Sequence, residues 1–216
     1  MAKHKTKIPQ IIIRRLPVYY KILKQLKSSS KDYVSSQDLA KLTGFSSSLI
    51  RKDLSYFGTF GRKSYGYDIC CLFNQIGQIM GFDKQKNLII IGAGHLGRAL
   101  AYNRGYQERG YNLKAVFDKN SKLIGEKINN LKVRDINDLE KYLGNTPILV
   151  AALTIDNNAA QKITDRLIAA GIKAIWNFTN VSLKTPAEVL VEDQIINQGL
   201  CHLSCKLKQN DCLEFH

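Results

Sequence analysis

A glycine-rich loop, Gly92-Ala93-Gly94-His95-Leu96-Gly97, has the clearest chemistry in the sequence. It follows the apolar run of residues 88 to 91 and leads into a helical pattern. In a strand–loop–helix unit, the first glycine permits a tight turn, the second lets backbone amides approach a pyrophosphate, and the third lets helix and strand pack closely. The helix N-terminus adds the positive end that an anion prefers. The loop predicts a dinucleotide site, in which His95 either lines the phosphate position or faces solvent.

A carboxylate stands where the next strand ends. The run "LKAVFD" closes at Asp118, 21 residues after Gly97. A carboxylate at this place accepts hydrogen bonds from ribose hydroxyls and repels a 2′-phosphate, so NAD(H) is favoured over NADP(H), although adjacent Lys119 weakens this discrimination. Thr154 follows a later strand. Because ligands bind beyond the carboxyl ends of parallel strands, Thr154 is predicted to touch the nicotinamide half.

A second chemical pattern lies in "SSSLIRKDLSYFG", residues 46 to 58. At 3.6 residues per turn, one face of this helix is apolar and the opposite face carries only hydroxyls and cations. The apolar stripe is Ile50, Leu54 and Phe57, and the polar face is Ser48, Arg51, Lys52 and Ser55. The polar face suits an anionic partner; the alternative is an ordinary solvated helix face.

The preceding residues predict the elements that hold this helix. Apolar spacing predicts a first long helix with Pro17 in its first turn. Ser35 and Asp38 form a capping-box-like start for a short second helix, which Gly44 ends. Ser46 or Ser47 then caps the third helix. Two short helices joined by a glycine-containing turn predict a helix-turn-helix, whose second helix enters the major groove of DNA.

A glycine-punctuated segment, "GTFGRKSYGYD", follows the third helix. Its aromatic residues and glycines predict a small hairpin with Arg62 and Lys63 at a cationic tip, as in the wing of a winged helix. A glycine-rich surface loop is the alternative. A further helix is predicted from residue 69 to 80. The candidate DNA-contacting residues are Arg14, Arg15, Ser46, Ser47, Ser48, Arg51, Lys52, Ser55, Arg62 and Lys63.

Charge supports this assignment, because the formal net charge of +14 is unevenly distributed. Residues 1 to 82 contain 14 Lys and Arg against 4 Asp and Glu, whereas the rest contains 18 against 14. A basic N-terminal module indicates a polyanionic partner, most commonly a phosphate backbone. The sequence thus predicts a DNA-binding domain at its N-terminus.

The remaining pattern alternates strands and helices. Strand-like runs at 131–133, 148–153 and 174–176 alternate with helical segments near 136–143 and 158–170, which predicts an α/β fold with a doubly wound parallel sheet. The predicted domains are a winged helix (1–82), a Rossmann domain (83–194) and a C-terminal helix and tail (195–216).

Composition and cysteine content indicate the cellular compartment. With 216 residues, 44% of them hydrophobic, the chain is expected to be globular. Lacking an apolar run of membrane-spanning length or a signal-type segment, it is expected to be cytoplasmic, with no membrane partner. The five cysteines are expected to be free thiols, buried or partly buried, with no metal site. A metal or redox role for Cys201, Cys205 and Cys212 is the alternative.

An enzyme is not expected. Only about 60 residues follow Thr154, too few for a separate substrate domain, and no His–carboxylate or Lys-based proton relay is evident. The cofactor is therefore interpreted as a signal. The alternatives are a small NAD-dependent oxidoreductase with a basic domain, and a DNA-binding sensor of another adenine nucleotide, such as a CoA derivative.

Taken together, these segments resemble the Rex family of redox-sensing transcriptional repressors, from about residue 8 to 207. "IRKDLSYFG" with the wing at 64–67 and "GAGHLGRAL" carry the resemblance. The resemblance implies a homodimer that exchanges its C-terminal helices and binds an A/T-rich inverted-repeat operator, which NADH releases. It also implies that Arg51 and Lys52 contact DNA and that Asp118 holds the adenosine ribose.

The sequence departs from the family at its switch. The family commonly couples an Arg of the first helix, a Tyr after the glycine-loop helix and an Asp before the C-terminal helix. The corresponding residues here are Lys21, Asn103 and Ile195. Without the carboxylate, the charge-assisted pair that distinguishes two dimer arrangements is absent. Either other contacts transmit the ligand state, or the response to NADH is weak.

Overall fold

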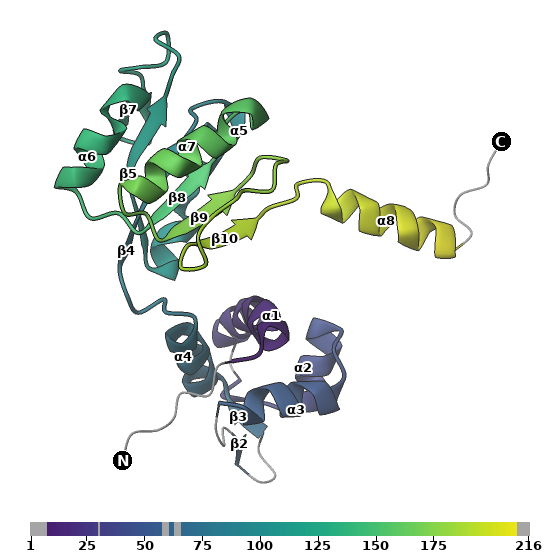
Figure 1. Ribbon diagram of the computed structural model, residues 1–216. Coiled ribbons are helices and arrows are strands. Elements are labelled where there is room, and N and C mark those ends of the chain that lie inside the picture. The colour runs from purple at the N-terminus through teal and green to yellow at the C-terminus, as the bar shows by residue number, and fades with distance from the viewer. Residues whose placement is uncertain (1–7, 30, 58–60, 63–65, 211–216) are drawn as a thin grey trace. The chain divides into compact units, whose positions relative to one another are not determined.

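The computed structural model describes residues 8–29, 31–57, 61–62 and 66–210. The chain divides into two compact units, Met1–Lys84 and Gln85–His216 (Figure 1). The segment from residue 195, predicted as a separate piece, is grouped with the second unit. None of the helices within the described residues has the length and apolar character needed to cross a membrane.

The first unit is built around four described helices. They are α1 (Gln10–Lys27), α2 (Ser36–Thr43), α3 (Ser47–Ser55) and α4 (Ile69–Ile79). Each helix buries apolar residues at helical spacing, and these meet in one core. Its buried members include Leu16, Leu23, Ile50, Leu54 and Leu72.

Local capping contacts bound the two helices of the helix-turn-helix, as predicted. Ser35 Oγ accepts a hydrogen bond from Asp38 N at 3.0 Å and donates to the Asp38 carboxylate at 2.7 Å. Gly44 ends α2 with φ of 76°, a left-handed conformation that glycine adopts readily. Ser46, rather than Ser47, caps α3, because its Oγ accepts from Leu49 N at 3.2 Å.

The predicted start of the first helix is wrong. α1 begins at Gln10, and Pro17 lies inside it rather than in its first turn. A proline in a helix interior removes one backbone hydrogen bond and costs about 3 kcal/mol. Burial of Ile12 and Leu16 on the same helix offsets this cost, since a fully buried aliphatic side chain contributes about 1.5–3 kcal/mol.

The predicted wing is present. Strands β1 (Tyr33–Val34), β2 (Gly61–Arg62) and β3 (Gly66–Asp68) form an antiparallel sheet in the order β1-β3-β2. Gly66 has φ of 88°, and a Cβ there would lie 2.5 Å from Val34 O. Only glycine therefore lets the hairpin approach β1 so closely. Lys63, the other predicted tip cation, lies outside the described residues.

One sheet organises the second unit, with strand order β10-β9-β8-β4-β5-β7-β6. All neighbours pair in parallel except β6, which is antiparallel to β7. The parallel strands have the order of a doubly wound Rossmann fold, which confirms the predicted fold class. The strands are β4 (Lys86–Ile91), β5 (Tyr111–Asp118), β6 (Lys127–Ile128), β7 (Leu131–Asp135), β8 (Val150–Leu153), β9 (Ala174–Asn177) and β10 (Leu190–Asp193).

Helices cover both faces of this sheet (Figure 1). Side chains alternate along β4, so Ile89 and Ile91 pack in one cluster with Leu139 and Leu167, whereas Leu88 and Ile90 pack in another with Ala101. The helical segments are α5 (His95–Tyr102), η1 (Arg104–Arg109), η2 (Ile136–Asp138), α6 (Leu139–Asn145) and α7 (Asn157–Ala169).

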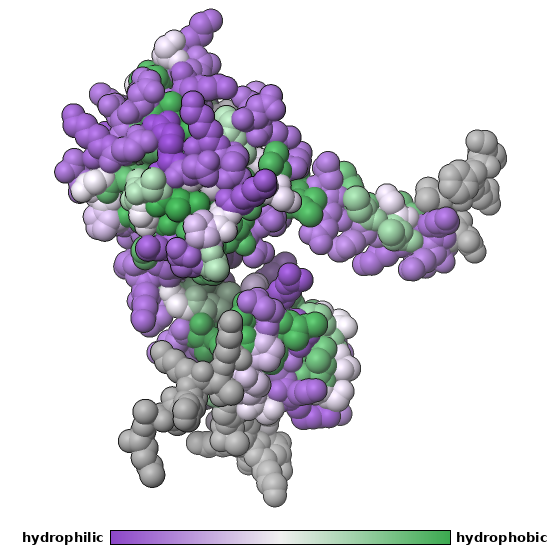
Figure 2. Space-filling view, in the orientation of Figure 1, coloured by the Kyte–Doolittle hydropathy of each residue, from purple (hydrophilic) through white to green (hydrophobic). Residues whose placement is uncertain are grey.

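Helix α8 (Gln198–Gln209) has no buried residue. Leu200, Leu203 and Leu207 are exposed at 64%, 56% and 44% and share one side of the helix at i, i+3 and i+7. Figure 2 shows hydrophobic surface along α8. We call Leu200, Leu203 and Leu207 the leucine stripe. None of the described residues covers it.

Candidate functional site

The glycine loop leaves β4 through a turn that requires glycine. Gly92 has φ of 104°, and a Cβ there would lie 2.4 Å from Thr154 O. The single hydroxyl proton of Thr154 Oγ1 is shared between Ile91 O and Gly92 O, both at 3.0 Å. Thr154 therefore joins the end of β8 to the loop, beside the position predicted for the nicotinamide half.

The other two glycines serve different purposes. A Cβ on Gly97 would lie 1.8 Å from Gly92 O, so only glycine lets α5 pack on the loop. A Cβ on Gly94 would meet nothing within 4 Å, which leaves space for a ligand at the N-terminus of α5. Gly94 and His95 are exposed and Leu96 is half-buried. The first amides of α5 thus face an open position that suits a pyrophosphate.

Asp118 lies at the carboxyl end of β5, next to the loop, as its spacing predicted. Its Oδ2 accepts from Ala93 N at 2.6 Å, and its Oδ1 accepts from Asn120 N at 2.8 Å. These backbone donors fix the carboxylate and leave further lone pairs on both oxygens. Two ribose hydroxyls could donate to those lone pairs, so the residues present fit an adenosine ribose.

Lys119 does not neutralise Asp118 by direct pairing. Its Nζ lies 3.0 Å from Asp156 Oδ2, and both side chains of this pair are largely exposed. Asp156 therefore holds the cation that would otherwise be available to a 2′-phosphate. This contact favours NAD(H), and sequence reasoning missed Asp156 because no motif marks the residue.

An Asp156→Ala variant is expected to bind NADPH about fivefold more tightly, with NADH affinity unchanged. The reason is that Lys119 becomes free, and an exposed ion pair contributes up to about 1 kcal/mol. Titration of both nucleotides by fluorescence measures the effect. Asp138→Ala, which removes another exposed carboxylate, is the control; an equal gain in that variant would show a general charge effect instead.

Arg98 is a further loop contact that the sequence did not reveal. Its Nε donates to Ala93 O at 3.0 Å, and its guanidinium pairs with Glu126. Both backbone polar groups of Ala93 are thus paired, the N–H with Asp118 and the carbonyl with Arg98. From sequence, Arg98 resembles any charged residue on an exposed helix face.

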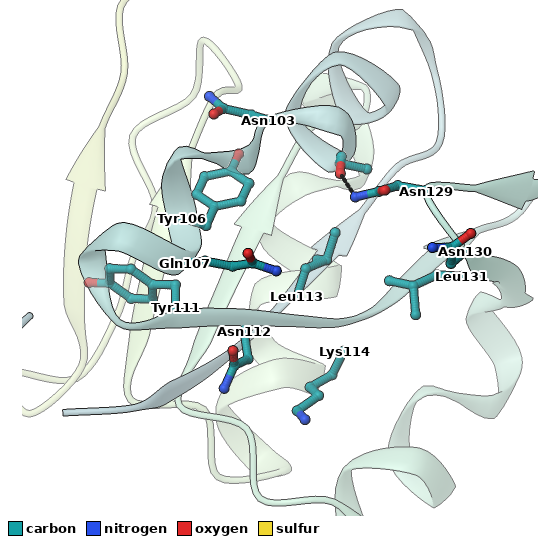
Figure 3. A pocket seen from close by; sticks show the side chains of 11 residues that line it. Asn103, Tyr106, Gln107, Tyr111, Asn112, Leu113, Lys114, Asn129, Asn130 and Leu131 are labelled. Carbon is teal, nitrogen blue, oxygen red and sulfur yellow. Dashed lines mark hydrogen bonds between the residues drawn. The ribbon is translucent and has the colours of Figure 1, made fainter. Parts of the chain in front are cut away.

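A cavity of about 340 Å³ lies among η1, β5 and the β6–β7 turn (Figure 3). Asn129 Nδ2 donates to Ala101 O at 2.9 Å at its edge (Figure 3). Tyr106 also lines the cavity; burial raises the pKa of its hydroxyl to about 12, and this hydroxyl has no hydrogen-bond partner among the described residues. No glycine-loop residue lines this cavity, so it is not the dinucleotide site.

The switch positions are exposed. Lys21 lies on α1, Asn103 follows α5, and Ile195 precedes α8. Asn103 Oδ1 accepts from Gly105 N at 2.8 Å and so caps η1, while neighbouring Tyr102 is 57% exposed. The structure gives Asn103 a local capping role that a tyrosine side chain cannot perform.

The polar face of α3 is exposed, as the helical period predicted. Ser48, Arg51, Lys52 and Ser55 are exposed, while Ile50 and Leu54 are buried. Arg51 Nη1 donates to Ser36 Oγ at 3.0 Å, which orients this side chain along the helix-turn-helix. Arg14 is exposed on α1, and Arg62 lies in β2.

Arg15 differs from the sequence interpretation. Its guanidinium makes two hydrogen bonds to Asp53, Nε to Oδ2 at 2.6 Å and Nη2 to Oδ1 at 2.7 Å, and its side chain is only 15% exposed. Because its donors are directed into the unit, we remove Arg15 from the candidate DNA-contacting residues. Helical spacing places Asp53 beside Ile50 and Phe57 on the apolar side of α3, but sequence reasoning missed Arg15 as its partner, because the two residues are 38 positions apart.

The expected burial of the cysteines is wrong. Cys70, Cys71, Cys201 and Cys205 are free and exposed, and Cys212 lies outside the described residues. Among the described residues, no group of three or more His, Cys, Asp or Glu could hold a metal ion.

A winged helix-turn-helix followed by a Rossmann domain with a dinucleotide loop defines a class of ligand-responsive DNA-binding proteins. Two family models match the chain, a putative DNA-binding protein N-terminus over residues 7–55 and a CoA binding domain over residues 83–181. The redox-sensing transcriptional repressor Rex of Thermoanaerobacter pseudethanolicus is 41% identical over 207 residues, covering 96% of this chain and 92% of the relative. That of Clostridium acetobutylicum is 40% identical, covering 95% and 96%.

Solved structures of a Rex-family repressor also match the chain. The Rex-family repressor RSP in complex with β-NAD⁺ and operator DNA matches with a TM-score of 0.89 and 39% identity, over 96% of both chains. RSP in complex with β-NADH matches with the same TM-score and 38% identity, over 96% of this chain and 98% of that chain. The chain belongs to the Rex family of redox-sensing transcriptional repressors.

Proposed function

We propose that this chain is a transcriptional repressor that binds an operator through its first unit and senses the balance of NADH and NAD⁺ through its second. The main support is that one chain joins an exposed cationic helix of a helix-turn-helix to a dinucleotide loop with open space at Gly94. The named complexes of RSP with β-NAD⁺, β-NADH and operator DNA support the same pairing of ligands. Such a regulator acts in the cytoplasm, where bacterial DNA lies.

NAD(H) would be held by the edge of the sheet where β4 and β5 end. The amides at Gly94 and His95 bind the pyrophosphate, and Asp118 accepts from the adenosine ribose. Thr154 lies beside the nicotinamide half. When bound, the cofactor supplies a redox-dependent shape and charge. Neither His95 nor His202, the described histidines, pairs with a carboxylate, which supports a sensor rather than an enzyme.

DNA would be bound by α3 in the major groove. Ser48, Arg51, Lys52 and Ser55 face the bases and phosphates, and Ser46 and Ser47 place backbone amides near the phosphates at the helix start. Arg14 of α1 and Arg62 of β2 would add further cations, and Lys63 stays a prediction from the sequence alone. A two-fold dimer would then match an A/T-rich inverted repeat.

The dimer would be formed by α8. An isolated helix of 12 residues is marginal in water, so α8 needs a surface that covers its leucine stripe. We propose that a second copy of the chain supplies this surface, with the C-terminal helices exchanged between the subunits.

The test of the function is fluorescence anisotropy on an A/T-rich inverted-repeat duplex at fixed salt, with NADH and NAD⁺ titrated separately. Release by NADH at concentrations where NAD⁺ has little effect is the expected result. It would also show that Lys21, Asn103 and Ile195 belong to an altered switch. Tight binding that neither nucleotide changes would contradict NADH sensing, and failure to bind the duplex would contradict operator recognition.

A second candidate is a DNA-binding protein of the same fold that responds to another adenine nucleotide. The match of a CoA binding domain to residues 83–181 favours testing CoA derivatives. In the same titration, release by acetyl-CoA or CoA but not by NADH would support this candidate.

An Arg51→Ala variant is expected to weaken operator binding by roughly 1–3 kcal/mol, while binding to a random duplex changes little, because a bidentate base contact discriminates by this amount. Anisotropy on both duplexes measures the difference. Lys41→Ala, which removes an exposed cation from α2, is the matched control. Equal losses on the two duplexes for Arg51→Ala would exclude base recognition by Arg51.

A further inference from the structure

A buried carboxylate lies in the middle of the helix that presents the candidate DNA-binding face. Asp53 is 1% exposed, whereas its charged neighbours on α3, Arg51 and Lys52, are exposed. Removing an ionised carboxylate from water is costly unless it is paired and hydrogen-bonded. The groups that pair with the Asp53 carboxylate therefore indicate its role.

All the recorded donors to Asp53 come from α1. Arg15 contributes Nε at 2.6 Å and Nη2 at 2.7 Å, and Tyr19, one turn further on, donates its hydroxyl at 2.7 Å. Tyr19 is almost completely buried, and burial together with its hydrogen bond to Asp53 raises the pKa of the phenol well above its usual value. We call Arg15, Tyr19 and Asp53 the buried triad.

The triad is not needed to hold α1 and α3 in the same core. Leu16 and Leu23 of α1 and Ile50 and Leu54 of α3 are already buried in one cluster. A buried ion pair adds little net stability compared with apolar residues of similar volume, and its best-supported role is to select one packing arrangement. Apolar contacts are non-directional, whereas three short hydrogen bonds are satisfied in only one orientation.

Orientation matters for base recognition. A group on the surface of a helix lies roughly 6 Å from the axis, so a rotation of about 20° moves it by about 2 Å. A shift of that size breaks a bidentate hydrogen bond to a base. It leaves phosphate attraction nearly unchanged, because Coulomb interactions vary slowly with distance.

We infer that Arg15, Tyr19 and Asp53 are positioning residues that fix the rotation of α3 on α1 and so set sequence-specific DNA recognition without touching DNA. The inference rests on the proposed operator-binding function. It assigns Arg15, which the sequence alone suggested as a DNA contact, an indirect role.

The test is a triple variant, Arg15→Met, Tyr19→Phe and Asp53→Leu, in the full chain. It replaces the triad with apolar groups and leaves no unpaired buried charge. Affinities for operator and random duplexes, salt dependence and thermal unfolding are measured together. The expected result is at least a tenfold fall in the operator-to-random affinity ratio, with random-duplex affinity, salt dependence and unfolding temperature close to wild type.

A wild-type affinity ratio in the triple variant would overturn the inference while leaving the proposed function intact. If the triple variant loses its fold, Tyr19→Phe decides, because it removes one hydrogen bond and retains the ion pair. A two- to fivefold lower ratio in Tyr19→Phe supports positioning, and an unchanged ratio overturns it. A wild-type chain that shows no preference for the operator removes both the proposed function and this inference.

Discussion

Replacing Gly97 with alanine is expected to weaken NADH and NAD⁺ binding by about 100-fold and to leave operator binding unchanged. A Cβ at this position would lie 1.8 Å from Gly92 O, which is backbone and cannot rotate away. α5 must therefore move away from the loop, and its first amides leave the pyrophosphate position. Overpacking of this kind costs up to about 3 kcal/mol, which corresponds to about two orders of magnitude in affinity.

The measurement is isothermal titration of both nucleotides, followed by operator anisotropy with NADH. We expect the variant to remain on the operator at NADH concentrations that release the wild-type chain. Gly144→Ala is the matched control, because a Cβ there meets nothing within 4 Å. NADH binding of wild-type strength in Gly97→Ala would refute the assignment of this loop as the cofactor site.

Replacing Leu203 with glutamate is expected to convert a dimer into monomers and to reduce operator affinity by more than 100-fold. The substitution places a charge at the centre of the leucine stripe, where a partner surface would bury it without a counter-ion. Two linked half-site contacts benefit from a high effective concentration, and a monomer that binds a single half-site loses this gain.

Light scattering and anisotropy measure the two effects. Cys205→Glu is the control, because Cys205 lies on the opposite side of α8, where a charge remains in water. A Leu203→Glu chain that stays dimeric would disprove the role of the leucine stripe. Failure of both variants to dimerise would show that α8 has lost its helix rather than its interface.

Features that depend on neighbouring residues were predictable from the sequence. The capping serine at position 35, Gly44 and the glycine loop act over a few residues, and each has the predicted local conformation. The run of residues 88–91 was also recognisable as a strand, because central parallel strands are apolar. The next strand was recognisable because it ends in a carboxylate, Asp118, at the spacing expected after a glycine loop.

Features that depend on distant contacts were not predictable. Asp53 and Arg15 are 38 residues apart, and no local pattern pairs them. β10 exposes Leu190 and Glu192, so it shows no buried run. α1 continues through Pro17 because the tertiary core outweighs a local rule. In each case the deciding partner lies elsewhere in the chain.

The pairing of both backbone polar groups of Ala93 within the chain affects how a cofactor signal could be generated. A loop that is already ordered before binding makes little conformational entropy available for signalling. The free energy for a response must then come from a difference in cofactor affinity between two conformations of the protein. Shifting such an equilibrium from 1:99 to 99:1 requires that the cofactor bind one conformation about 10⁴-fold more tightly than the other. Because the loop is already ordered, this difference in affinity must arise from contacts with the nicotinamide end of the cofactor.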